Sequence, residues 1–297
     1  MDLSSFQCDN SSNKLIISKV PKITKKEKCV LGIDEAGRGP VLGPMVYAVA
    51  YCPISCLQKL EELKFADSKT LTEENRERLF KIIDENNDFI GWMLEIISPN
   101  TISNSMLKRC KYNLNELSHD SAIGLIKEVI KAGINADEVY LDTVGIAEKY
   151  QNKLSEIFPD LKITVAKQAD STYPIVSAAS ICAKVARDRV IRSWNFRENR
   201  NEDFEYGSGY PNDPVTKKFL TESLDPIFGY PQLVRFSWST ASKILQEKAV
   251  EVEWSDDEEC DSTQSIRKFF GKRKTSPKKC KDHSFFKDRH LSQVQNL

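Results

Sequence analysis

The chain has 297 residues, of which 40% are hydrophobic, enough for a substantial core, and its 43 basic residues balance its 43 acidic ones. This balance excludes a global basic field that would attract nucleic acid, so any such attraction must come from local patches. The eight cysteines form no CxxC pair and there are only three histidines, so we expect no zinc site. No apolar run approaches the ~20 residues that span a bilayer, so we expect no membrane association.

The N-terminal part of the chain predicts a leader followed by strands. Residues 1–27 are polar and carry several lysines, which predicts a flexible leader. Strand-like apolar runs follow at about 28–35, 44–52 and 89–97. The first two runs are joined by Gly37–Gly43, a glycine- and proline-rich segment typical of a hairpin connection.

Helices are predicted to alternate with further strands. Thr72–Asn86 has a helical pattern that Thr72 can cap, and acidic residues in its first turn favour the helix dipole. Beyond it we expect an amphipathic helix at 117–132, a strand at Glu138–Asp142, a helix at Ile146–Phe158, a strand at Leu161–Ala166 and a buried helix at 174–192. This order predicts an α/β fold, with a mixed β-sheet and helices on its faces.

The composition changes after about residue 249. Residues 251–261 contain seven acidic residues and no basic ones, whereas residues 267–281 contain eight basic residues and no acidic ones. Opposite charge blocks of this kind are typical of a solvated tail. We therefore expect one domain at 28–248, followed by a charged, largely disordered tail at 249–297.

Four acidic residues stand where predicted strands end. Asp34 and Glu35 end the first strand, Asp142 ends another, and Asp170 follows the strand at 161–166. Because ligands gather at the carboxyl ends of strands in open α/β sheets, these acids can converge there. Four like charges raise one another's pKa values, and bound divalent cations remove that penalty, so the cluster indicates Mg²⁺ or Mn²⁺. Two such ions can activate a water and stabilise the leaving oxygen of a phosphodiester.

The first two of these acids belong to a Gly-x-Asp-Glu-x-Gly-x-Gly segment. Its glycines, Gly37 and Gly39, let the backbone approach a ligand and expose N–H groups, and Arg38 between them suits a phosphate. An ordinary turn does not require two acids followed by two glycines with an arginine between them. The other two acids, taken singly, are better explained as residues that begin a turn or cap a helix. The segment therefore indicates an enzyme that acts on a phosphodiester.

Six segments of the chain carry a family resemblance. In chain order they are Gly32–Pro40, Asp67-Ser68-Lys69, Asp142-Thr143-Val144-Gly145, Lys167–Asp170, Ser177–Asp188 and Gly207–Pro214. They resemble the motifs of ribonuclease H type 2, the ribonuclease HII family. The Thr-Val-Gly and Gly-Ser-Gly-Tyr-Pro-Asn-Asp-Pro variants are similar to those of its eukaryotic catalytic subunits. The resemblance covers about residues 28–248.

The resemblance implies a fold, a reaction and a set of catalytic residues. The fold is an RNase H-like mixed sheet followed by a helical C-terminal part. Asp34, Glu35, Asp142 and Asp170 match the family's four metal-binding catalytic acids. The implied enzyme is an endoribonuclease with two Mg²⁺ or Mn²⁺ ions. It cuts the RNA strand of RNA/DNA hybrids and cuts 5′ to single ribonucleotides in duplex DNA, leaving a 3′-hydroxyl and a 5′-phosphate. Its implied roles are removal of ribonucleotides and RNA primers in DNA replication and repair, including mismatch repair.

Substrate contacts are implied in the same way. The backbone of Gly37, Arg38 and Gly39 can approach the 2′-hydroxyl, the group that distinguishes RNA from DNA at a given site. Tyr210 matches the family tyrosine that stacks on the sugar at the RNA–DNA junction. Without the resemblance, it would be better explained as a partly buried aromatic residue in a loop. Further nucleic-acid contacts are expected at Lys69 and Asn113.

Other polar residues allow structural explanations. Arg187 and Asp188 could contact substrate or form a buried structural pair. His119 has no acid or cysteine partner at a useful spacing, so we expect it to be structural.

The segment at 263–270 resembles the short motif that docks on DNA sliding clamps. Ile266, Phe269 and Phe270 would share one face of a helical turn and fill an apolar pocket. Threonine stands where the motif has glutamine. Short patterns recur by chance, and the segment could instead pack on a partner protein. The basic residues 272–274 fit a nuclear-import or nucleic-acid patch, so we expect a nuclear protein.

The eukaryotic members of the family work as a heterotrimer, so the resemblance implies two noncatalytic accessory subunits as partners. Exposed apolar surface at about 215–250 would be their docking site. Zero net charge agrees with dependence on partners, because a solitary nuclease usually carries more basic surface.

Two rival functions remain. The first is a noncatalytic scaffold subunit of a nucleic-acid-processing complex, against which the complete set of four acids argues. The second is a metal-dependent DNA nuclease or integrase with the same sheet. Such an enzyme would cut all-DNA duplexes and would not need the glycine turn at 37–39 together with Tyr210.

Overall fold

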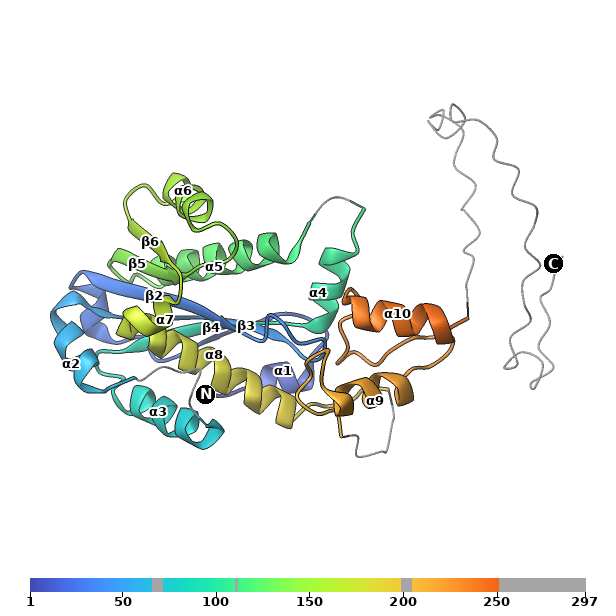
Figure 1. The fold of residues 1–297 in the computed structure, drawn as a ribbon. Coiled ribbons are helices and arrows are strands. Elements are labelled where there is room, and N and C mark those ends of the chain that lie inside the picture. Colours follow the sequence, from blue (N-terminus) through green and yellow to red (C-terminus); the bar gives the residue numbers. More distant parts are fainter. Residues whose placement is uncertain (66–71, 110–111, 199–204, 251–297) are drawn as a thin grey trace, which may run out of the picture.

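The computed structural model describes residues 1–65, 72–109, 112–198 and 205–250 (Figure 1). Within these ranges, strands form one mixed sheet in the order β1-β4-β3-β2-β5-β6. Its strands are β1 (Lys14–Ile17), β2 (Cys29–Ala36), β3 (Met45–Pro53), β4 (Gly91–Ile97), β5 (Ala136–Asp142) and β6 (Lys162–Ala166). The predicted mixed sheet is confirmed.

The pairing of the strands determines which side chains meet at the sheet edge. β2 and β3 form the predicted antiparallel hairpin, in which Asp34 lies opposite Ala48 and Glu35 opposite Tyr47. β4 and β1 continue the antiparallel part. β5 is parallel to β2, and β6 is parallel to β5. The carboxyl ends of β2, β5 and β6 therefore lie at the same edge of the sheet.

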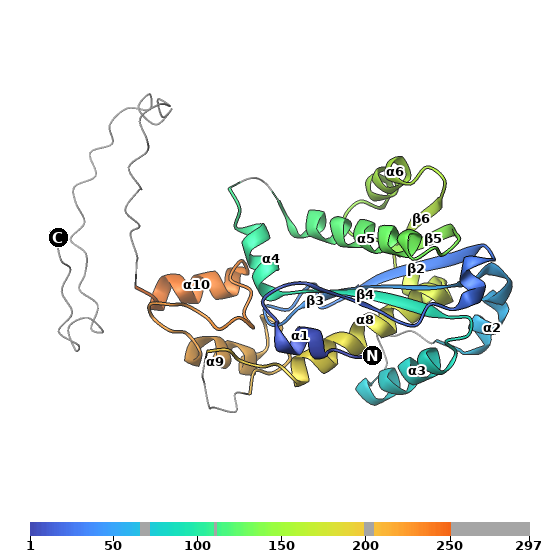
Figure 2. The same ribbon diagram turned by 180° about the vertical axis from the view of Figure 1, so that it is seen from behind.

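Helices cover both faces of this sheet (Figures 1 and 2). One layer contains α2, α3 and α8, and the other contains α4, α5 and α6. The helix bounds are α2 (Leu57–Glu62), α3 (Glu73–Glu85), α4 (Pro99–Met106), α5 (Leu114–Lys131), α6 (Ala147–Ile157), α7 (Ala169–Thr172), α8 (Pro174–Arg192), α9 (Pro214–Glu222) and α10 (Ser239–Lys248). Short 3₁₀ turns lie at η1 (Lys22–Lys25) and η2 (Ile54–Cys56).

The central strands alternate between the two layers. Val46, Ala48 and Ala50 of β3 face the α8 layer, whereas Tyr47 and Tyr51 of the same strand face the α5 layer. All nine residues of β3 are buried, as expected for a strand covered on both sides.

α8 packs closely on β2 because of one glycine. A Cβ at Gly32 would lie 2.5 Å from the backbone nitrogen of Val176, a distance that real side chains do not adopt. Glycine at this position therefore lets the small-residue helix lie directly on the strand that carries Asp34 and Glu35.

The expectation of a flexible leader at residues 1–27 is wrong. α1 (Ser4–Cys8) buries Phe6 against Trp194, with ring centroids 6.1 Å apart. β1 pairs with β4 and forms one edge of the sheet. The apolar residues of this segment are few and isolated among polar ones, so their contacts with distant parts of the chain leave no periodic pattern in the sequence.

Several predicted elements agree closely with the structure. Thr72 caps α3 by accepting a hydrogen bond from the Asn75 N–H at 3.3 Å, and α8 spans the predicted residues 174–192. α4 was not predicted. It begins at a Ser98 cap and a proline, and it buries Ile102.

The C-terminal helices α9 and α10 build a third apolar cluster around the turn between β2 and β3 (Figure 1). Val41 and Leu42 of the turn contact Leu233 and Val234, and the Gly43 N–H donates to the Leu233 carbonyl at 2.7 Å. The turn that follows the predicted catalytic acids is thus buried against the end of the described chain.

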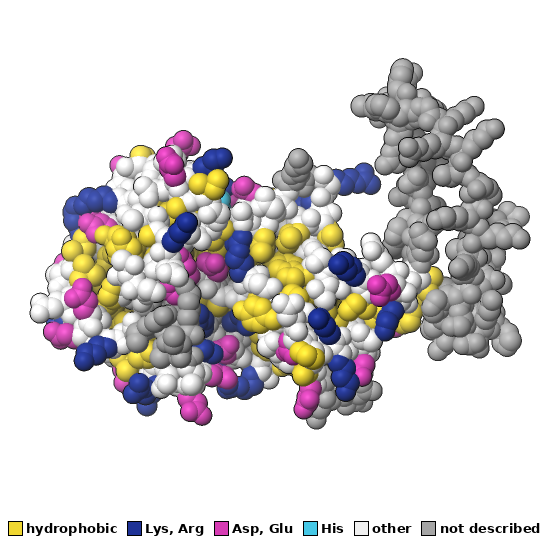
Figure 3. All heavy atoms as spheres, in the orientation of Figure 1, with side chains coloured by type: hydrophobic (Ala, Val, Ile, Leu, Met, Phe, Trp, Pro, Cys, Tyr) yellow, Lys and Arg dark blue, Asp and Glu magenta, His cyan; other side chains and the backbone are white. Residues whose placement is uncertain are grey.

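On the face seen in Figure 3, basic and acidic side chains are interspersed. No helix in the described ranges is both long and apolar enough to cross a membrane. The predicted tail at 249–297 falls almost entirely outside the described residues.

Candidate active site

A pocket of about 340 Å³ opens where β2 and β5 end. Its walls contain three of the predicted acids together with the glycine turn, the loop tyrosine and several basic residues. The lining residues are Asp34, Glu35, Ala36, Gly37, Arg76, Asp142, Lys184, Arg187, Asp188 and Tyr210. The structure therefore brings together residues that are far apart in the sequence.

Asp34 is buried at the floor of this pocket, with 5% of its surface exposed. Its carboxylate accepts hydrogen bonds from the Glu35 N–H at 2.8 Å and from the Ser180 hydroxyl. Burial raises the pKa of Asp34, and the neighbouring charges of Asp142 and Asp170 raise it further.

Glu35 is the second acid of the pocket. Burial raises its pKa, and the charge of Asp34 adds to the increase. Arg38 opposes this effect, as does the hydroxyl of Tyr47 on the adjacent strand. A cation that binds near two buried carboxylates with raised pKa values is favoured, because its charge stabilises their ionised forms.

Asp142 joins the end of β5 to the start of α7. Its Oδ1 accepts from the Thr143 N–H at 2.9 Å and from the N–H of Ala169, the first residue of α7, at 3.3 Å. Asp170 lies in α7 and is 1% exposed. It influences Asp34 electrostatically but does not line the pocket. In the described ranges, no group of three or more His, Cys, Asp or Glu side chains is arranged so that it could hold a metal ion as it stands.

The turn after the acids requires glycine. Gly37 has a φ of 78°, and a Cβ on it would overlap the Arg187 side chain and lie 2.8 Å from the Pro44 carbonyl oxygen. A Cβ on Gly39 would lie 3.3 Å from the ring of Tyr210. The tyrosine ring thus lies next to the turn.

All three carbonyls of the turn are bound from the C-terminal segment. Arg235, which is fully buried, donates to the Gly37 carbonyl at 2.6 Å and to the Arg38 carbonyl at 3.2 Å. The Trp238 indole donates to the Gly39 carbonyl at 3.0 Å, and the Arg235 guanidinium lies 4.8 Å from the Trp238 ring. In a trans peptide the next N–H points opposite to the carbonyl, so the N–H groups of Arg38 and Gly39 are directed away from Arg235.

Sequence reasoning missed Arg235 and Trp238. One signal was present, because Arg235 is an isolated charge in the segment Leu-Val-Arg-Phe. A charged residue in such a context is buried only when its donors are satisfied. The identity of its acceptors could not be read from the sequence.

The side chain of Arg38, for which the sequence suggested a phosphate contact, is hydrogen-bonded within the fold. It donates to the Ser118 hydroxyl at 2.8 Å and to the Asn115 side chain, both on α5. The guanidinium therefore ties the turn to the α5 layer, and the backbone of Arg38 remains the part available to a ligand.

Tyr210 lies in a loop that is held together by hydrogen bonds to Asp213. The ring is 52% exposed. Asp213 accepts from the Ser208 N–H at 2.6 Å, the Ser208 hydroxyl at 2.7 Å and the Val215 N–H at 2.9 Å. These bonds to Ser208 and Val215 lower the pKa of Asp213 to about 2, so its carboxylate keeps the loop closed at neutral pH.

The remaining predicted residues have different outcomes. Asn113 caps α5, accepting from the Asn115 N–H at 2.8 Å and the Glu116 N–H at 3.1 Å. Lys69, Ile266, Phe269 and Phe270 lie outside the described residues.

Arg187 and Asp188 do not form a pair with each other. Asp188 accepts from Arg76 of α3 at 2.7 Å, whereas the half-buried Arg187 lies against the glycine turn and donates to the Leu42 carbonyl at 3.4 Å. Adjacent positions on α8 point about 100° apart, so each side chain meets a different neighbour.

His119 is structural, as expected. Its ring stacks on Tyr150 at 3.9 Å between centroids, and Nε2 lies 3.3 Å from the Val144 carbonyl oxygen. Because Val144 follows Asp142 closely, this contact supports the strand end that carries the acid.

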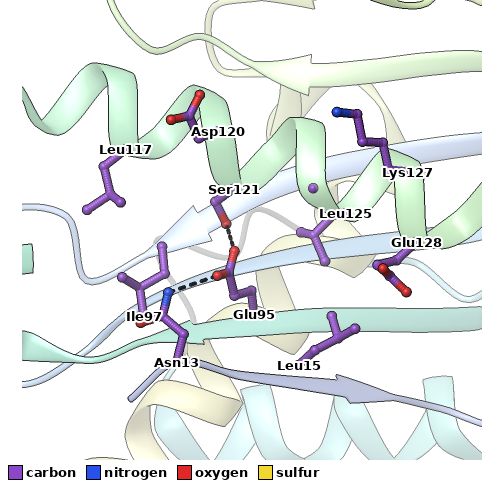
Figure 4. Close-up of a pocket in the computed structure, with 11 residues that line it drawn as sticks. Asn13, Leu15, Glu95, Ile97, Leu117, Asp120, Ser121, Leu125, Lys127 and Glu128 are labelled. Atoms are coloured by element: carbon purple, nitrogen blue, oxygen red, sulfur yellow. Dashed lines mark hydrogen bonds between the residues drawn. The ribbon is translucent and has the colours of Figure 1, made fainter. Parts of the chain in front are cut away.

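A second hollow of about 440 Å³ lies between α5 and strands β1 and β4 (Figure 4). The Glu95 carboxylate in it accepts from the Asn13 amide at 2.9 Å and from the Ser121 hydroxyl at 2.5 Å. These bonds join the edge strand to α5, so Glu95 serves the fold.

Comparison with known proteins agrees with this site. The family model described as Ribonuclease HII matches residues 31–241. The chain is 52% identical to a ribonuclease H2 subunit of Bos taurus over 302 residues, covering 100% of both chains.

Solved structures show the same architecture. A ribonuclease H2 from Pyrococcus horikoshii has a TM-score of 0.61 and 32% identity, over 74% of this chain and 98% of that one. The RNase HII in a PCNA complex from Archaeoglobus fulgidus has a TM-score of 0.58 and 31% identity, over 72% and 96%. Bst-RNase HIII in complex with Mn²⁺ shares the fold, with a TM-score of 0.53 and 16% identity over 75% and 70%. The chain therefore belongs to the ribonuclease HII family and is a ribonuclease.

Proposed function

We propose that this ribonuclease cuts the RNA strand of RNA/DNA hybrids and cuts 5′ to single ribonucleotides in duplex DNA, leaving a 3′-hydroxyl and a 5′-phosphate. The observation that carries the proposal is one pocket. It combines Asp34, Glu35 and Asp142 with the Gly37 turn and the exposed ring of Tyr210. Acids alone would suit any phosphodiesterase, whereas the turn and the tyrosine add a place for a sugar hydroxyl.

The acids are suited to divalent cations. Asp34, Glu35, Asp142 and Asp170 offer only oxygen donors, which Mg²⁺ and Mn²⁺ prefer. Burial and mutual repulsion raise the pKa of both Asp34 and Glu35, so a cation near them would be bound favourably. Two bound ions would supply an activated water and stabilise the leaving oxygen. The Mn²⁺ complex of Bst-RNase HIII, a protein of the same fold, agrees with this choice of ion.

The backbone of the turn would recognise the ribonucleotide. The N–H groups of Arg38 and Gly39 point away from Arg235 and can donate to a 2′-hydroxyl, which a deoxyribose lacks. The Tyr210 ring lies over Gly39 and offers an apolar face to the sugar. Substrates without the hydroxyl would lose these contacts.

Basic side chains in the same pocket would face the phosphates. Arg76, Lys184 and Arg187 line the pocket together with the acids. These basic side chains limit the repulsion between the acids and a polyanionic substrate. Lys69 and Asn113 remain proposed contacts farther along the nucleic-acid backbone.

Accessory subunits would bind at the C-terminal helices. Phe228 is 86% exposed, and it lines a hollow of about 440 Å³ together with mainly apolar residues of α10 and of the segments on either side of it. A side chain as large and apolar as Phe228 in this position suits an interface with partner proteins. Zero net charge agrees with partners that help to bind the substrate.

We also propose a second kind of partner and a cellular role. Ile266, Phe269 and Phe270 in the tail would dock on a DNA sliding clamp, in keeping with the PCNA complex of the Archaeoglobus fulgidus relative. The protein would act in the nucleus, removing ribonucleotides and RNA primers during DNA replication and repair.

The test uses three matched duplexes with Mg²⁺: an RNA/DNA hybrid, a DNA duplex with one ribonucleotide, and the same duplex in all-DNA form. Each is incubated with the chain alone and with its accessory subunits. We expect cleavage of the first two only, greatest in the complex and absent in Asp34→Ala and Asp142→Ala. Cleavage of the all-DNA duplex would favour a DNA nuclease. A folded complex that cuts none of the three would favour the noncatalytic scaffold.

A further inference from the structure

Tyr47 lies next to Glu35, one of the proposed catalytic acids. In the antiparallel pairing of β2 and β3 it is the partner of Glu35, so the two side chains stand next to each other on the same face of the sheet. That face is the one covered by α5, and Tyr47 is only 2% exposed. The hydroxyl end of the ring therefore lies in the buried space between Glu35 and α5.

The groups around this hydroxyl are polar, although the surrounding core is apolar. Ser118 of α5 lies within reach of it, and the charges of Glu35 and Arg38 both act on it. Ser118 itself is fully buried and accepts a hydrogen bond from Arg38 at 2.8 Å. Tyr47, Ser118 and Arg38 thus form a group of polar side chains next to Glu35, on the face of the sheet that α5 covers.

The Tyr47 hydroxyl has no well-aligned hydrogen-bond partner among the described residues. Buried hydroxyls in folded proteins are normally satisfied, so such a group requires an explanation. The Glu35 carboxylate, on the paired strand and the same face, is the charged acceptor next to this hydroxyl.

We propose that Tyr47 is a positioning residue, whose hydroxyl donates to the Glu35 carboxylate and fixes its orientation toward a divalent cation. The proposal rests on the metal-dependent function proposed above. A carboxylate that binds a metal through one oxygen is oriented by a donor to the other, and loss of such a donor weakens binding. Tyr47 contacts neither substrate nor metal and acts only through Glu35.

The same strand contains a matched control. Tyr51 lies four residues farther along β3 on the same face, is fully buried, and also has a hydroxyl without a well-aligned partner. Its strand partner is Leu31, which is not an acid. Replacing either tyrosine by phenylalanine removes the same atom from a similar environment, but only one of the two stands beside a catalytic acid.

The experiment measures Mn²⁺ binding by the full chain through the rise in melting temperature during a Mn²⁺ titration. For Tyr47→Phe we expect an apparent affinity about 10-fold weaker than wild type. The metal-free melting temperature should stay close to that of wild type, and Tyr51→Phe should bind Mn²⁺ as wild type does. Cleavage by Tyr47→Phe, measured in the complex, should recover as Mn²⁺ is raised.

A double-mutant cycle with Glu35→Gln separates positioning from a general packing effect. If the hydroxyl acts through the carboxylate, Tyr47→Phe should not weaken Mn²⁺ binding further in the Glu35→Gln background. Equal losses in both backgrounds, or equal losses in Tyr47→Phe and Tyr51→Phe, would overturn the proposal. So would a Tyr47→Phe chain that fails to fold, because the hydroxyl would then serve the fold. A wild-type protein that neither binds Mn²⁺ nor cleaves would instead refute the proposed function.

Discussion

The guanidinium of Arg235 donates to the carbonyl oxygen of Gly37 at 2.6 Å, across 198 residues of sequence. The same side chain binds the carbonyl of Arg38 at 3.2 Å and that of Gly43 at 2.8 Å. One buried residue of the C-terminal segment therefore sets the course of the turn that follows the proposed catalytic acids. The C-terminal segment thus orients the backbone that is proposed to meet the sugar.

Arg235→Gln tests this relationship. We expect the free energy of unfolding to fall by about 3 kcal/mol or more, because several buried carbonyls lose a charged donor. Activity on a single ribonucleotide should fall as well. Urea denaturation measures the first effect. Arg197→Gln, at an arginine whose side chain is 41% exposed, should stay within about 0.5 kcal/mol of wild type. Equal stability of the two variants would contradict the structural role of Arg235.

Gly37→Ala tests the requirement for a bare backbone in the turn. The φ of 78° alone is expected to destabilise the alanine variant by about 1 kcal/mol, and the displaced Arg187 adds to this. Activity should fall at least ~10-fold, because small displacements of a binding backbone are costly.

Gly124→Ala is the matched control for that substitution. A Cβ on Gly124 in α5 meets no atom within 4 Å, so alanine should stabilise the helix by roughly 0.5–1 kcal/mol. Thermal unfolding and cleavage rates are measured for both variants and compared with those of wild type. A Gly37→Ala enzyme as active as wild type would show that the turn tolerates a side chain.

Tyr210→Ala tests the contact with the sugar. Since the ring is 52% exposed, stability should change by no more than about 0.5 kcal/mol. The value of kcat/KM on a single ribonucleotide should fall ~10-fold or more, as expected when a stacking contact of about 1–3 kcal/mol is removed. Tyr210→Phe should retain most of the stacking and lose only the hydroxyl. Full activity of the alanine variant would remove Tyr210 from the substrate site.

The sequence predicted the location of the acids because their positions follow from local rules. Asp34 and Asp142 end apolar runs of strand length, and parallel strands place such ends at one edge. The helix at 174–192 was equally predictable, since its buried small residues form one uninterrupted pattern. These features depend on near neighbours in the chain.

Other features depend on contacts between distant segments, and no local pattern marks them. The leader at 1–27 looked polar, yet Phe6 is buried against Trp194. The sequence suggested a phosphate contact for Arg38 but did not indicate that its side chain donates to Ser118 of α5. The hydrogen bonds of Arg235 to the turn belong to the same class.

His119 should make stability depend on pH. Burial lowers its pKa below the usual 6.5, so the unfolded chain takes up a proton more readily than the folded one. The stability that neutral His119 provides is therefore complete above about pH 6.5 and is lost as the pH falls through the lowered pKa of the folded state. Melting curves from pH 8 to pH 5 should show a smaller decline in His119→Gln than in wild type. An identical decline would assign the pH dependence to other groups.

Phe228→Asp tests the proposed docking surface. The ring is 86% exposed, so the isolated chain should fold with unchanged stability, while binding to the accessory subunits should weaken at least ~10-fold. Ile130→Asp, at a 46% exposed apolar residue of α5, serves as the control. Calorimetric titration measures both. Equal binding by the two variants would show that the interface does not include Phe228.

The central claim is that the pocket at the ends of β2 and β5 cuts nucleic acid at a ribonucleotide. The most direct measurement maps the cut in an end-labelled DNA duplex with one ribonucleotide, using the complex and Mg²⁺. We predict a single product that ends in a 3′-hydroxyl immediately 5′ to the ribonucleotide, and no product with Asp142→Ala. A cut at any other position, or a cut that persists in Asp142→Ala, would contradict the assignment of this site.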